Sequence, residues 1–75
     1  MTDPHQELLD AAQKLGATLG KLTQATLIHL AMPSTESRQE VVIQQADFLT
    51  SFKAYNQSVE TLQDAEASIS KKELN

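Results

Sequence analysis

A single proline, Pro33, most constrains this chain, because it separates two long stretches that both have the residue spacing of an amphipathic helix. Before it, apolar positions recur in alternating steps of four and three residues, as on one face of an α-helix. The pattern predicts a first helix over about residues 4–31, with Asp3 as its cap, Pro4 in its first turn and Gln6 completing a capping box. Its predicted apolar row comprises Leu8, Ala12, Leu15, Leu19, Leu22 and Thr26.

The stretch after Pro33 contains no further proline and no glycine, and it repeats the same spacing over a greater length. It predicts a turn over 32–35, a second helix over about 36–71 and a frayed tail over 72–75. Ser34, Thr35 or Ser37 could cap this helix. Its predicted row comprises Val41, Gln45, Phe48, Phe52, Tyr55, Val59, Leu62, Glu66 and Ile69, and Val42, Ile43, Ala46 and Leu49 widen the first half.

A short connection between two helices makes them antiparallel neighbours, so residues 1–75 are expected to form one all-α domain, a two-helix hairpin. A chain of 75 residues without cysteine has few means of stabilising a small core. The apolar stripe over 41–49 is also broader than one neighbouring helix can cover. We therefore expect the hairpin to complete a helical bundle by self-association or hetero-association.

The residues expected to contact a partner follow from this stripe. The aromatic side chains Phe48, Phe52 and Tyr55 could instead form the core, and the pattern favours that for them. Truncating Leu19 or Phe52 to alanine is expected to cost about 2–5 kcal/mol, as in a core, and Ser51 is expected to tolerate change. The full predicted set is Val41, Val42, Gln45, Ala46, Phe48, Leu49, Phe52, Tyr55, Leu19 and Leu22.

Small residues recur in the first helix at Ala12, Gly16 and Gly20. This spacing favours a close helix–helix crossing, and the alternative is a helix that is locally weakened by about 1 kcal/mol per glycine. His29 is expected to be half-buried at the end of the apolar row.

Charge and composition narrow the function. The net charge is −4 and the six basic residues are scattered, so no nucleic-acid partner is expected. No apolar run is long enough for membrane insertion, and no signal peptide is visible. This favours a cytoplasmic protein, with signal-less export left open. No catalytic residues, metal ligands, cofactor site or small-molecule substrate are expected, so we predict that the chain is not an enzyme.

The leading hypothesis is a protein–protein interaction module, namely an assembly, adaptor, chaperone or inhibitor hairpin. A homodimeric four-helix bundle that binds nucleic acid is an alternative, which the acidic balance disfavours.

A second alternative rests on two short segments, Leu30-Ala31-Met32-Pro33-Ser34 at the turn and Tyr55-Asn56-Gln57-Ser58-Val59 in the second helix. In these the chain resembles the needle subunits of bacterial type III secretion systems, which are short helix–turn–helix chains with a Pro-Ser turn. The resemblance covers less than half of the chain, and the turn lacks the second proline that is common in that family. It implies a polymer-forming structural subunit.

Overall fold

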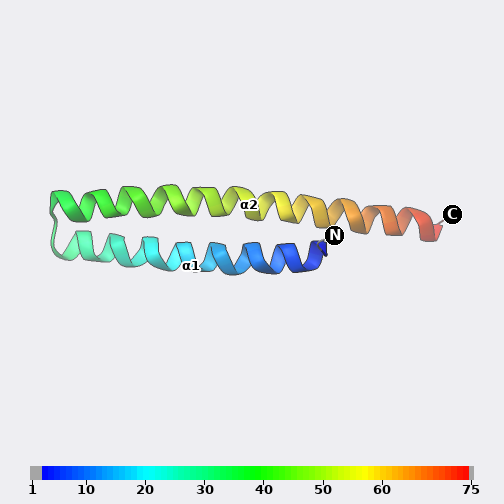
Figure 1. Cartoon of the computed structure of the whole chain (residues 1–75), viewed down its shortest axis with the longest axis horizontal. Coiled ribbons are helices and arrows are strands. Elements are labelled where there is room, and N and C mark those ends of the chain that lie inside the picture. The colour runs from blue at the N-terminus through cyan, green and yellow to red at the C-terminus, as the bar shows by residue number, and fades with distance from the viewer. Residues whose placement is uncertain (1–2, 75) are drawn as a thin grey trace.

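The chain folds into two antiparallel helices joined by a tight turn (Figure 1). A computed structural model describes the backbone of residues 3–74 and the side-chain surroundings of residues 3–69. Helix α1 spans Pro4–Ala31 and helix α2 spans Thr35–Leu74. The molecule measures 62 × 17 × 15 Å, and α2 continues beyond the N-terminal end of α1. The predicted all-α hairpin is confirmed.

Local sequence signals account for the start of α1. The Asp3 carboxylate accepts a hydrogen bond from the His5 backbone N–H at 3.0 Å, and Pro4 occupies the first helical position, where its missing N–H costs nothing. The predicted capping box is wrong in one detail, because Gln6 donates to Asp10 at 2.9 Å instead of reaching back toward Asp3. The bounds of α1 coincide with the predicted range.

The turn between the helices is closed by a reciprocal pair of serines. The Ser37 backbone N–H donates to Ser34 Oγ at 3.0 Å, and the Ser34 backbone N–H donates to Ser37 Oγ at 2.9 Å. This is the geometry of a capping box, with serine in the place of the usual acidic or amide residue. His29 Nδ1 lies 2.7 Å from Ser37 Oγ and so connects the last turn of α1 to the first turn of α2.

Helix α2 is slightly longer than predicted. It begins at Thr35 and continues to Leu74, so the predicted end at residue 71 is three residues early. The predicted tail over 72–75 is thus helical up to Leu74, and Asn75 lies outside the described residues. No proline or glycine interrupts this stretch, so no residue stops the backbone hydrogen-bond ladder.

The two helices meet along an interhelical seam that alternates large and small side chains. We define the seam as the residues that are buried or half-buried at four-and-three spacing. In α1 these are Pro4, Leu8, Ala11, Leu15, Thr18, Leu22, Ala25 and His29; in α2 they are Ser37, Val41, Gln44, Phe48, Ser51, Tyr55, Ser58, Leu62 and Ala65.

Small residues lie level with larger ones across the seam, because the contact between His29 and Ser37 places residues whose numbers sum to about 66 opposite each other. Thr18 and Ser51 line one groove between the helices, and Ala25 and Gln44 line the next. The register set by His29 and Ser37 places Thr18 level with Phe48, and Leu15 level with Ser51. The two most buried residues among those described are Ala25 at 6% and Ser51 at 8% exposure. Small side chains therefore lie opposite large ones, so the two helices interdigitate along the seam.

The predicted apolar rows are displaced by one residue at every second position, although Thr26 and Val59 of those rows are also half-buried. Leu19 is 49% exposed and Phe52 is 45% exposed, whereas the adjacent residues Thr18 and Ser51 lie in the seam. Ser51, which was expected to tolerate change, is buried. The same shift by one residue moves the seam from Ala12, Thr26, Gln45 and Glu66 to Ala11, Ala25, Gln44 and Ala65.

This seam leaves the molecule with an unusually large surface. The accessible surface is 6011 Å², whereas a compact monomer of 8.2 kDa exposes about 4,500 Å². The radius of gyration is 17.6 Å, against about 11 Å for a compact domain of this length. No large side chain among the described residues is fully buried. Neither described helix combines the length and the apolar character that are needed to cross a bilayer.

Candidate interaction surface

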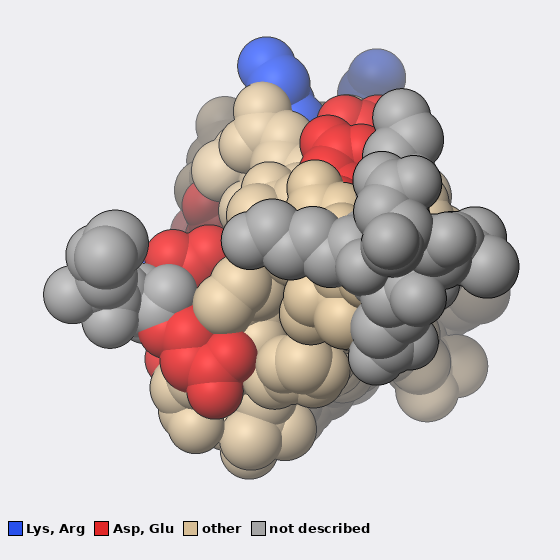
Figure 2. All heavy atoms as spheres, turned by 90° about the vertical axis from the view of Figure 1, so that its right-hand side faces the viewer, with Lys and Arg blue, Asp and Glu red and all other residues tan. Residues whose placement is uncertain are grey.

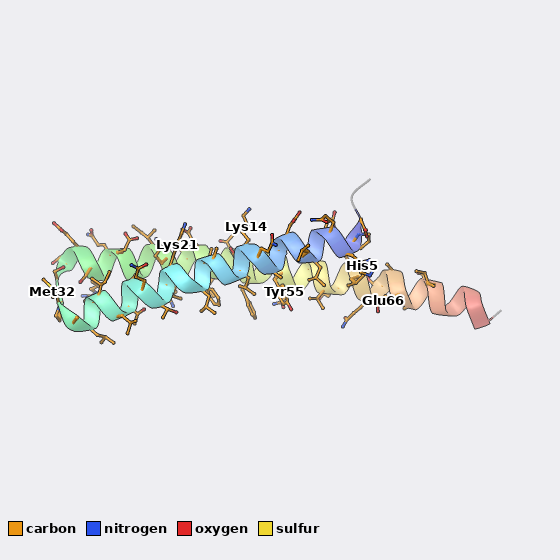
Figure 3. The ribbon with its side chains drawn as sticks, turned by 90° about the horizontal axis from the view of Figure 1, so that it is seen from below. His5, Lys14, Lys21, Met32, Tyr55 and Glu66 are labelled. Atoms are coloured by element: carbon orange, nitrogen blue, oxygen red, sulfur yellow. The ribbon has the colours of Figure 1, made fainter. Side chains whose placement is uncertain are left out.

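The line along which the two helices pack is open to solvent on two opposite sides, which we call the edges of the hairpin. One edge carries charged side chains. Lys14 and Lys21 of α1 line grooves on this edge together with Glu40 and Asp47 of α2. Figure 3 shows both lysines projecting from the same edge. These charges do not form ion pairs between the helices. Among the described residues, only His5 and Asp3 come within ion-pair distance, at 3.4 Å in the first turn of α1.

The opposite edge is uncharged between Arg38 and Glu66 of α2, which lie at its two ends. In α1 the lysines of the charged edge each come one position before a large seam residue. Residues that come one position after a small seam residue, such as Leu19 after Thr18, therefore lie on the opposite side of the helix. Antiparallel packing places the corresponding residues of α2 on that same side. We call this surface the uncharged face. It comprises Leu9, Ala12, Gly16, Leu19, Thr23, Thr26 and Leu30 of α1 and Val42, Gln45, Leu49, Phe52, Asn56 and Val59 of α2.

Large apolar side chains on the uncharged face are accessible to solvent. Six of them, namely Leu9, Leu19, Leu30, Val42, Leu49 and Phe52, are between 45% and 71% exposed. In the end view of Figure 2 the acidic atoms gather at the left and the top, the basic atoms lie at the top, and uncharged residues form the rest of the visible described surface. Single exposed apolar residues are ordinary, but a contiguous row of them is typical of an interaction site.

The ten residues predicted to contact a partner divide among three places. Val41, Phe48, Tyr55 and Leu22 lie half-buried in the interhelical seam. Val42, Gln45, Leu49, Phe52 and Leu19 lie on the uncharged face, while Ala46 is exposed on the outer side of α2. Phe48 connects the two sets, since its ring centroid lies 6.0 Å from that of Phe52.

Gln44 is a seam residue that sequence reasoning missed. Its side-chain N–H donates to Glu40 Oε1 at 2.7 Å, but its Oε1 atom is shielded from solvent and has no hydrogen-bond partner. A shielded carbonyl oxygen without a donor costs about 1–3 kcal/mol. Its neighbour Gln45 had been placed in the predicted row, and a shift by one residue would have identified Gln44.

The two glycines have no packing role inside the hairpin. A Cβ atom built on Gly16 or Gly20 would meet nothing within 4 Å. The predicted close crossing at Ala12, Gly16 and Gly20 therefore does not occur between α1 and α2. Gly16 lies on the uncharged face, where it leaves a shallow gap between larger neighbours, whereas Gly20 lies on the outer side of α1.

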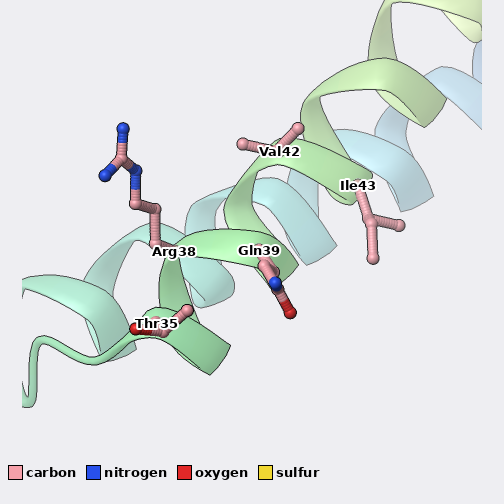
Figure 4. Close-up of a pocket in the computed structure, with 5 residues that line it drawn as sticks. All are labelled: Thr35, Arg38, Gln39, Val42 and Ile43. Carbon is pink, nitrogen blue, oxygen red and sulfur yellow. The ribbon is translucent and has the colours of Figure 1, made fainter.

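The turn end of the hairpin carries further exposed apolar side chains, among them Leu27, Ile28 and Met32. Figure 4 shows a depression there that is lined by Thr35, Arg38, Gln39, Val42 and Ile43. All of these residues belong to α2, so this depression is a surface hollow on one helix and not a cleft between two. Among residues 3–69, no group of three or more His, Asp or Glu side chains is placed to hold a metal ion.

Comparison with protein-family models, with curated proteins and with solved structures finds no match to this chain.

Proposed function

We propose that this chain is a non-enzymatic protein–protein interaction module that docks helices of another chain onto its uncharged face. One observation carries the proposal: large apolar side chains run half-exposed along both helices on the edge that carries no charge. Exposing such a surface to water is unfavourable. Covering it with another apolar surface lowers the free energy by about 25 cal/mol per Å².

The small size of many side chains in the seam supports the same proposal. Small residues occupy alternate seam positions, while larger residues of the same helices point outward. A sequence selected only for a stable two-helix monomer would place its large apolar side chains between the helices. Large apolar side chains on an outer face are more consistent with a contact to a second molecule.

The test compares two exposed apolar residues of α2. Leu49 is 57% exposed on the uncharged face, and Ile43 is 53% exposed on the side that the charged edge borders. The chain has no cysteine, so Leu49→Cys and Ile43→Cys each introduce a single thiol. Alkylation rates of the two thiols are measured in the cells that naturally produce the protein, with circular dichroism to verify that both variants are helical.

We expect the thiol at position 49 to react at least tenfold more slowly than the thiol at position 43, because a partner covers the uncharged face. Equal rates would overturn the proposal. A slow reaction at position 43 with a fast reaction at position 49 would also overturn it, since the partner would then occupy the other side.

A further inference from the structure

We propose that the occupant of the uncharged face is a second copy of this chain, lying antiparallel to the first, so that two hairpins form a four-helix bundle. This inference rests on the proposed function and specifies its partner. Among closed symmetric assemblies the two-fold dimer requires one self-complementary surface, and the uncharged face has that property.

The pattern along α2 is the same in both directions. A row with four-and-three spacing alternates between two positions of the helix. Where two antiparallel helices pack along such rows, a residue at one position lies opposite a residue at the other position. A two-fold axis between Leu49 and Phe52 places Leu49 level with Phe52 of the second copy. It also places Val42 level with Val59 of the second copy, and Gln45 level with Asn56. Apolar residues thus meet apolar residues, and amides meet amides that can hydrogen-bond to each other.

Helix α1 has a compatible pattern about the same axis. His29 contacts Ser37, so Leu15 is level with Ser51 and the axis crosses α1 beside Gly16, which then lies beside Gly16 of the second copy. Leu19 then falls level with Ala12 of the second copy, and Leu9 falls level with Thr23 of the second copy. A Cβ atom at Gly16 would meet nothing within 4 Å, so the opposing helix has room to approach there.

The charge distribution permits this contact. Each copy has a net charge of −4, so two copies repel unless their charged residues stay apart. The charged edge with Lys14, Lys21, Glu40 and Asp47 faces away from the interface. At the ends of the face, the antiparallel arrangement brings Arg38 of one copy toward Glu66 of the other, which are opposite charges.

The available area is sufficient. Six side chains that each expose on the order of 100 Å², with small residues between them, approach the roughly 800 Å² per partner of a standard interface. The hairpin exposes roughly 1,500 Å² more than a compact monomer of its mass, so burying this face still leaves it well solvated.

The experiment uses the purified full chain. Light scattering coupled to size exclusion is expected to give twice the 8.2 kDa mass of one chain. Leu49→Glu is expected to weaken the dimer at least a hundredfold while leaving the chain helical, because it buries a charge in the interface. Ile43→Glu, the matched control, is expected to leave the dimer intact. A dimer that both substitutions weaken equally, or neither weakens, would overturn the proposal.

Cysteine pairing tests the arrangement independently of any unfolding by glutamate. Gln45→Cys combined with Asn56→Cys is expected to form a covalent dimer on mild oxidation. The two positions are eleven residues apart on one helix, about 16 Å, so they cannot pair within a copy. Gln39→Cys with Glu60→Cys on the outer side of α2 is the control and is expected to stay monomeric on a denaturing gel. Absence of the covalent dimer, or its equal formation in the control, would sink this arrangement.

The outcomes separate this inference from the proposed function. A purified monomer, or a mass that grows continuously with concentration as in a filament, rejects the two-copy bundle. If the thiol at position 49 is nevertheless protected in cells, the proposed function stands and the occupant is a different chain. If that thiol reacts freely in cells as well, both proposals fail.

Discussion

Replacing Gln44 by methionine should stabilise the hairpin. Gln44 Oε1 is shielded within the seam and has no donor, while the other end of the amide donates to the exposed Glu40 at 2.7 Å. The shielded oxygen costs about 1–3 kcal/mol, and a hydrogen bond to an exposed carboxylate returns only a small part of that. Methionine has nearly the same length and flexibility and no polar atom that needs a partner.

The expected gain is about 1–2 kcal/mol in the free energy of unfolding. For a domain of 60–100 residues, each kcal/mol shifts Tm by roughly 4–8 °C. The measurement is thermal unfolding followed by circular dichroism at 222 nm, at one fixed protein concentration because association also shifts Tm. Urea titration gives the same free energy independently.

Gln39→Met is the matched control, since Gln39 lies exposed on the outer side of α2 and the chemical change is identical. It should move Tm by less than the equivalent of about 0.5 kcal/mol. If Gln44→Met is no more stable than Gln39→Met, the Gln44 oxygen has a hydrogen-bond donor in solution, and the reasoning from its isolation is refuted.

Three further substitutions test the seam, the glycine and the turn, each by the same thermal unfolding assay. Leu22→Ala should lower the free energy of unfolding by about 2 kcal/mol, because it truncates a half-buried seam residue. The control Leu27→Ala, on the outer side of α1, should change it by less than about 0.5 kcal/mol. Equal costs would show that the seam is misplaced. Gly20→Ala should stabilise α1 by about 1 kcal/mol, since the added methyl group meets nothing within 4 Å, and a loss would indicate a hidden contact at this position. Ser34→Ala should cost about 1 kcal/mol because it removes the cap of α2, and an unchanged Tm would show that the turn does not depend on it.

The existence and the ends of the helices could be predicted from the sequence because they depend on local chemistry. Pro33 prevents a helix from continuing through it, Asp3 and Pro4 start α1, and unbroken four-and-three spacing extends α2. The overhang of α2 follows from the unequal lengths on the two sides of Pro33. The end of α2 at Leu74, by contrast, could not be predicted, since no residue there either stops or caps the helix.

The candidate surface could be predicted only in part. Broad apolar character over 41–49 indicated that α2 carries more apolar side chains than α1 can cover, and Val42 and Leu49 are exposed as that requires. The role of Leu19 and Phe52 was misassigned, because large apolar residues at helical spacing are usually core. Gly16 was singled out for a close crossing, but the sequence did not specify which surface it would serve.

The rotation of each helix about its own axis was decided by the tertiary structure alone. Two rows in α1 share Leu8, Leu15 and Leu22, and they differ most at the position between the last two, where hydrophobicity favours Leu19 over Thr18. Packing reverses that choice, because Thr18 lies level with Phe48, whose large side chain leaves room in the seam for a small residue opposite it. A sequence by itself determines which faces of a helix are apolar, but the distance between two helices determines which of those faces lies between them.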